Sequence, residues 1–178
     1  MTSLLILFVD LIRLRRGPQD LPASLNLLII TGFLLIVAAM LGDHMNKDFT
    51  DKLIFALTQV VILTAIVWII LALNKKSERT VQTLTAFYGT SVLIQLVVWP
   101  FRSWLQSMSE EAQQRATIPL FAVVVLAIWS FVVMVYIYRN ALDCSRGKAI
   151  LMSILTQLII GMVMLTLFAS ELQMEMVK

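Results

Sequence analysis

Charged residues are scarce in this chain of 178 residues, and so are the residues that bind metals. Only 14% of the residues are Asp, Glu, Lys or Arg, whereas a soluble domain carries about 25%. There is one cysteine, Cys144, and one histidine, His44, which excludes an intramolecular disulfide, a Cys/His zinc site and paired-histidine haem ligation. This composition argues against a soluble enzyme, and we expect no metal ion and no other cofactor.

Short catalytic motifs are also missing. The sequence contains no G-x-x-x-x-G-K-[ST] phosphate loop, no H-E-x-x-H metal motif and no G-x-S-x-G nucleophile elbow. The net charge of +3 is explained by basic residues between apolar segments, at the membrane surfaces, so it needs no nucleic-acid partner. We therefore predict a protein that is not an enzyme and does not bind nucleic acid.

Long apolar runs are abundant, since 60% of the residues are apolar and the mean hydropathy is +0.89. A helix of about 20 residues crosses the hydrocarbon core of a bilayer, and five runs reach about that length: Leu21–Leu41, Leu53–Leu73, Val81–Phe101, Ile118–Tyr138 and Ala149–Ala169. None contains Asp, Glu, Lys, Arg or His, which disfavours proton- or sodium-coupled transport. No run alternates polar and apolar residues as a barrel strand does. The predicted fold class is all-α: a polytopic membrane bundle of five transmembrane helices, forming one integral membrane domain over residues 1–178.

Basic residues alternate in density between the runs, and this predicts the orientation of the chain. The segments before the first run and after the second and fourth carry nine Lys and Arg: Arg13, Arg15, Arg16, Lys75, Lys76, Arg79, Arg139, Arg146 and Lys148. The segments on the other side carry five: Lys47, Lys52, Arg102, Arg115 and Lys178. By the positive-inside rule, we expect the N-terminus in the cytoplasm and the C-terminus outside.

The first sixteen residues form an apolar stretch that is too short to span a bilayer. The arginines follow this stretch, whereas in a signal peptide they would precede it. We expect residues 1–16 to form an interfacial amphipathic helix that ends at Gly17 and Pro18. Its apolar residues are expected to face lipid or the bundle: Leu4, Leu5, Phe8, Leu11 and Ile12.

Polar side chains inside the runs gather mainly in the third and fifth. Tyr88, Ser91 and Gln95 fall within about 60° on a helical wheel. Gln157 lies in a second stripe, between Ser153 and Gly161. Polar groups that face lipid lack hydrogen-bond partners, so both stripes are expected to face the bundle. Two interpretations stay open: hydrogen bonding between helices that fixes their packing, or a small polar cavity that binds a lipid head group or a substrate through Tyr88, Ser91, Gln95 and Gln157.

Three segments carry a resemblance to a known family. They are the turn RGPQDLP (Arg16–Pro22), the third run with its flank (Arg79–Phe101) and WSFVVMVYIYRNALD (Trp129–Asp143). With the five-span layout, they resemble small bacterial relatives of the Yip family, the Ypt/Rab-interacting-protein-like membrane proteins. For bacterial relatives, the resemblance implies an integral membrane protein of unassigned role. We therefore expect a multi-pass protein of the bacterial inner membrane, and the orientation predicted from the basic residues makes its C-terminus periplasmic. Eukaryotic members act in vesicle traffic through an N-terminal cytosolic region, of which this chain has almost none.

Two classes of function follow from these features. The first is a non-enzymatic inner-membrane protein that is structural or accessory to a membrane assembly. Its partners are the lipid bilayer and, within the membrane, another protein or a second copy of the chain. The alternative is a small uncoupled transporter or a lipid-binding protein that uses a polar cavity between the third and fifth spans. A cavity at that place favours the alternative, whereas dry contact between the helices favours the first class.

Overall fold

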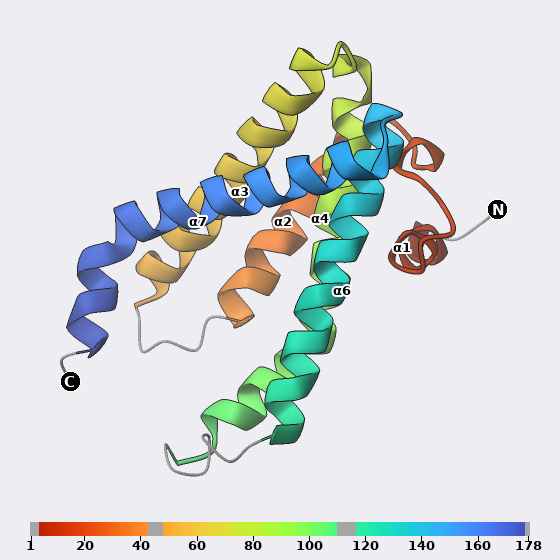
Figure 1. Cartoon of the computed structure of the whole chain (residues 1–178). Coiled ribbons are helices and arrows are strands. Elements are labelled where there is room, and N and C mark those ends of the chain that lie inside the picture. Colours follow the sequence, from red (N-terminus) through yellow and green to blue (C-terminus); the bar gives the residue numbers. More distant parts are fainter. Residues whose placement is uncertain (1–3, 43–47, 110–116, 177–178) are drawn as a thin grey trace.

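The computed structural model describes residues 4–42, 48–109 and 117–176 (Figure 1). Within these ranges the chain forms helices and no strand, which confirms the all-helical prediction. The six α-helices are α1 (Leu4–Ile12), α2 (Leu25–Gly42), α3 (Phe49–Leu73), α4 (Thr80–Gln106), α6 (Thr117–Leu142) and α7 (Arg146–Met176). Two short 3-10 helices, η1 (Pro18–Asp20) and η2 (Ser77–Arg79), precede α2 and α4.

Among the described residues, four helical segments are long and apolar enough to cross a membrane. They correspond to the second to fifth predicted spans and are Phe49–Leu73, Ser77–Gln106, Thr117–Leu142 and Arg146–Phe168. The first predicted span corresponds to α2, which is a shorter apolar helix. It begins four residues later than predicted because Pro22 precedes it and Ser24 caps it: the Ser24 hydroxyl accepts a hydrogen bond from the Leu27 amide at 3.4 Å.

The packing centre of the bundle is α4, which contacts α1, α2, α3 and α6. Eight consecutive residues of α4, Thr83–Thr90, are buried, so this segment is covered on every side. Its threonines satisfy their own hydroxyls, because Thr83, Thr85 and Thr90 each donate to the carbonyl four residues earlier, at 2.7 Å. As a result, these three threonines need no polar partner from the neighbouring helices.

The N-terminal helix α1 packs on α4 and α6. It is viewed end-on in Figure 1 while α6 runs in the plane of the picture, so α1 crosses it steeply, as a helix in a membrane interface would. Of its predicted contact residues, Phe8 and Leu11 are buried against the bundle and Ile12 is half-buried, whereas Leu4 and Leu5 are exposed. Residues 1–3 of the predicted segment lie outside the described residues.

The end of α1 comes at Ile12, before the predicted stop at Gly17 and Pro18. Leu14 adopts the left-handed conformation, with φ 59°, and the Arg15 amide donates back to the Asp10 carbonyl at 2.9 Å. A left-handed leucine is unfavourable by about 1–2 kcal/mol, and its side chain compensates by packing on the core. The prediction missed this because no glycine marks the turn.

The connector between α1 and α2 is fixed to α4 and α6. The Gly17 amide donates to Asp20 Oδ2 at 2.9 Å, which closes the turn around Pro18. From α4, Gln82 Nε2 donates to the Leu21 carbonyl at 2.7 Å. The turn RGPQDLP therefore positions α1 against the bundle.

One end of the bundle is closed by a polar cluster that we call the clamp, formed by Lys76, Arg79 and Asp143. Asp143 accepts from Lys76 Nζ at 2.8 Å and from Arg79 Nη1 at 2.7 Å. Arg79 Nη1 also donates to the carbonyls of Asn140 and Ala141 at the end of α6. The clamp therefore joins the α3–α4 connection to the α6–α7 connection.

From the clamp, the long helices diverge in two arms. Figure 1 shows α3 and α7 on one side and α4 and α6 on the other, with α2 between them. The arms meet where the chain turns from α3 to α4 and from α6 to α7, and they separate toward the opposite end. At that opposite end, Trp99 Nε1 donates to the Leu41 carbonyl at 3.2 Å and ties α4 to α2.

Replacing Gly89 with alanine is expected to loosen α1. A Cβ at this position would overlap the ring of Phe8, so the ring has to leave its site against α4. Overpacking of this kind costs about 1–3 kcal/mol. We expect Gly89→Ala to unfold at a lower temperature in detergent and to be cut faster by trypsin at Arg13 and Arg15.

Gly161→Ala is the matched control, because nothing lies within 4 Å of a Cβ added there. Equal losses in the two variants would contradict the packing described for Phe8.

The clamp is expected to weaken in acid. The hydrogen bond from Lys76 and the charges of Arg79 and Lys76 hold the pKa of Asp143 below its ordinary value of 3.8. Ionised Asp143 therefore makes its full contribution to the stability of the folded protein above about pH 3.8. This contribution is lost as the pH falls through the pKa of Asp143 in the folded state, which is lower than that in the unfolded state. The midpoint of thermal unfolding should fall more steeply below that pH in the wild type than in Asp143→Asn. Glu78→Gln, which removes a carboxylate from the α3–α4 connection beside Arg79, should keep the wild-type slope. A flat wild-type profile would refute the role of Asp143.

Candidate ligand-binding pocket

The polar stripe predicted on the third span divides between two environments. Tyr88 is 4% exposed and its hydroxyl lies 2.5 Å from the Thr64 hydroxyl of α3. Thr64 donates its proton to the Val60 carbonyl, so the Tyr88 hydroxyl is the donor of this pair. Tyr88 therefore joins α4 to α3 by a hydrogen bond, and its hydroxyl proton is not available to a ligand.

A second hydrogen bond between a tyrosine and a threonine lies in the half of the bundle nearer the clamp. Tyr138 of α6 is fully buried, and its hydroxyl lies 2.8 Å from Thr156 of α7. Thr156 donates to the Met152 carbonyl, so Tyr138 donates to Thr156. Ser153, also fully buried, donates to the Ala149 carbonyl at 2.9 Å. All of these hydroxyls are satisfied inside the protein, and the ring of Tyr138 packs edge-on against Phe87.

The other part of the stripe lines a pocket of about 310 Å³ between the two arms, which we call the glutamine pocket. Three glutamines from three helices meet there: Gln59 of α3, Gln95 of α4 and Gln157 of α7. The remaining lining residues come from α4 and α6, and they are Ile94, Val98, Trp99, Arg102, Val123, Leu126, Ala127 and Ser130. The pocket thus lies between the third and fifth predicted spans.

The three amides of the glutamine pocket and its arginine have no hydrogen-bond partner among the described residues. Gln95 is half-buried, while Gln59, Gln157 and Arg102 are exposed at the pocket's border. Three amides offer both donors and acceptors, so the pocket is equipped to bind a polar group.

Sequence reasoning found some of these residues and missed others. Of the four predicted ligand-binding residues, Gln95 and Gln157 line the pocket, whereas Tyr88 and Ser91 do not. Arg102 was assigned only to the external loop, and Ser130 was not singled out. The signal that would have found Arg102 is its spacing: it follows Gln95 by seven residues and so lies on the same face of α4.

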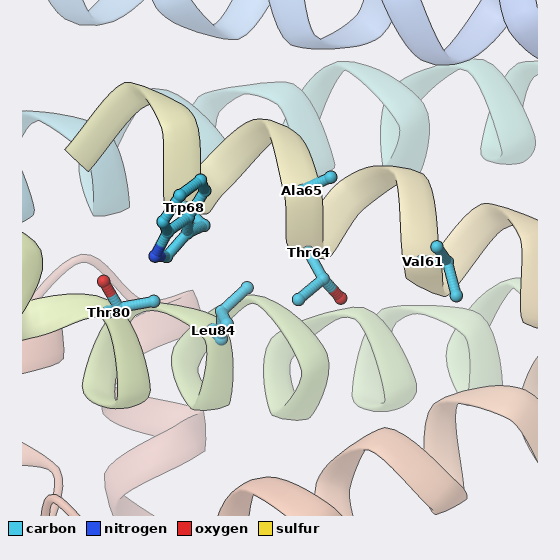
Figure 2. A pocket seen from close by; sticks show the side chains of 6 residues that line it. All are labelled: Val61, Thr64, Ala65, Trp68, Thr80 and Leu84. Atoms are coloured by element: carbon cyan, nitrogen blue, oxygen red, sulfur yellow. The ribbon is translucent and has the colours of Figure 1, made fainter. Parts of the chain in front are cut away.

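A second, apolar groove of about 390 Å³ runs between α3 and α4 nearer the clamp. Figure 2 shows Thr64, Trp68 and Leu84 side chains between the two helices, with Thr80 at one end. The Thr64 and Thr80 hydroxyls donate to backbone carbonyls of their own segments. With those groups engaged, the groove presents mainly apolar surface and suits a hydrocarbon chain.

No family model matches the chain, and neither a curated protein nor a solved structure matches it. The resemblance to Yip-like proteins therefore stays a prediction. In the part of the chain that the structure describes, no group of three or more His, Cys, Asp or Glu residues is placed to bind a metal ion.

Tyr88→Phe and Gln95→Leu are expected to affect stability in opposite ways. Tyr88→Phe removes an interhelical hydrogen bond, which in membrane proteins is worth about 0.6–1.7 kcal/mol. Gln95→Leu removes an amide that has no partner in the described part of the chain, so it should leave the protein as stable as the wild type or more stable. Thermal unfolding in detergent measures both. A clear loss of stability in Gln95→Leu would mean that the amide serves helix packing.

Proposed function

We propose that this chain is a non-enzymatic, five-span protein of a bacterial inner membrane that binds a polar-headed lipid in the glutamine pocket. The observation that carries the proposal is the convergence of Gln59, Gln95 and Gln157 on one pocket without hydrogen bonds to the described chain. An amide left unpaired in hydrocarbon costs several kcal/mol. A bound molecule with polar groups would remove that cost.

The dimensions of the helices support the membrane layout. With 18 residues, α2 has a length of about 27 Å, close to the hydrocarbon thickness of about 30 Å. It packs between α3 and α4 and exposes apolar side chains such as Ile29 and Phe33. We therefore infer that α2 also crosses the membrane, as the first of five spans. From the distribution of Lys and Arg, we infer that the clamp end and the N-terminus face the cytoplasm and that the C-terminus is periplasmic.

Binding is favoured over transport because the clamp half of the bundle is closed. A transported polar group needs a path to both surfaces, but the hydroxyls of Tyr88, Tyr138 and Thr156 are already paired and buried. The pocket groups also favour binding over catalysis. Amides, a hydroxyl and an arginine recognise polar groups, and arginine does not act as a base because it stays protonated. The role is accessory in this sense: the protein holds a lipid within a membrane assembly.

Native mass spectrometry of the protein extracted mildly from its host tests the proposal. The wild type is expected to retain one bound molecule of defined mass, and both Gln95→Leu and Gln157→Leu should reduce its occupancy at least about tenfold. Each variant loses the polar partners of a buried head group, which are worth about 1–3 kcal/mol. Gln106→Leu removes an amide from α4 outside the pocket and should retain the molecule. Equal occupancy in Gln95→Leu and the wild type would refute the proposal.

A further inference from the structure

We propose that the ligand is a phosphate-bearing lipid of the outer leaflet, whose phosphate is bound by Arg102 at the rim of the glutamine pocket. This inference rests on the proposed function and names its ligand class. Among the described residues that line the pocket, Arg102 is the only charged one. It makes no ion pair or hydrogen bond in the described part of the chain, so its guanidinium is available.

The spacing along α4 gives the pocket a charged rim and a neutral polar interior. Arg102 lies seven residues beyond Gln95, which is about 10 Å along the helix axis. Between them, Val98 and Trp99 line the wall, and the indole N–H of Trp99 is engaged by the Leu41 carbonyl. A ligand therefore meets a cation at the end that we assign to the periplasm and amides deeper in the bundle.

A phospholipid has matching chemistry in the same order. The planar guanidinium fork binds phosphate oxygens in a bidentate geometry. The carbonyl oxygens of the ester linkages lie deeper than the phosphate and accept hydrogen bonds, which the amide groups of Gln95, Gln59 and Gln157 can donate. The hydrocarbon tails have exposed apolar side chains beside the pocket on α6, including Val124, Val125 and Ile128.

The two ends of the bundle differ, so a lipid can enter the pocket from one leaflet only. Toward the clamp, the buried pair of Tyr138 and Thr156 ties α6 to α7. Toward the opposite end, the arms separate and Arg102 is exposed. A lipid therefore enters sideways between the arms, with its phosphate at the level of Arg102.

The experiment is a titration of delipidated, full-length protein in a neutral maltoside detergent, followed by native mass spectrometry. The probes are dioleoyl phosphatidylglycerol, dioleoyl glycerol with the same tails, and inorganic phosphate. We expect one phosphatidylglycerol to bind at least about tenfold more tightly than dioleoyl glycerol. Arg102→Gln should abolish that difference by weakening phosphatidylglycerol binding about tenfold or more, and Arg102→Lys should restore it in part. Arg139→Gln, which removes an exposed arginine at the clamp end, should bind like the wild type.

The outcomes separate this inference from the proposed function. If Gln95→Leu weakens binding of both lipids but Arg102→Gln binds phosphatidylglycerol like the wild type, the pocket binds lipid but Arg102 does not recognise the phosphate. In that case the inference is overturned and the proposed function stands. If binding of neither lipid responds to Gln95→Leu, both are overturned. If inorganic phosphate binds as tightly as phosphatidylglycerol and displaces it, the ligand is a soluble anion and the assignment to a lipid is wrong.

Discussion

The structure depends on the burial of α4 among four other helices. A membrane helix that is covered on all sides has to satisfy its polar groups locally, and Thr83, Thr85 and Thr90 do so through the carbonyls of the preceding turn. Close approach then becomes possible, as where the ring of Phe8 packs on Gly89. Removing that local hydrogen bonding would leave buried hydroxyls without partners in the middle of the bundle.

The pocket is a consequence of where this close packing stops. Near the clamp, the connections between helices are short and joined by Arg79 and Asp143, so the arms cannot separate there. Farther away, α3 and α7 diverge from α4 and α6 (Figure 1), and a pocket of about 310 Å³ is lined by residues of all four helices. The amides of Gln59, Gln95 and Gln157 lie in this region, where none of the described residues forms a hydrogen bond with them.

Apolar run length was sufficient to predict the helical class and most helix positions, because hydropathy over 20 residues depends little on tertiary contacts. Helix ends were less predictable where a local cap decides them, as at Ser24, or where packing stabilises a left-handed leucine, as at Leu14. A helical wheel placed Tyr88 and Gln95 on one face but gave no information on which neighbour each would meet. Arg102 was overlooked because a basic residue at the end of a span is explained by the orientation of the chain in the membrane. That explanation gave no reason to consider the residue as part of a pocket.

The unequal lengths of the helices have a consequence for the surrounding bilayer. An 18-residue helix such as α2 covers about 27 Å, whereas the 26 residues of α6 cover about 39 Å. Lipids beside α2 must therefore thin to match it, or α6 must tilt to fit the thickness set by its neighbours. Each Å of hydrophobic mismatch costs a fraction of a kcal/mol. The protein should consequently partition between membranes, or between regions of one membrane, according to their thickness.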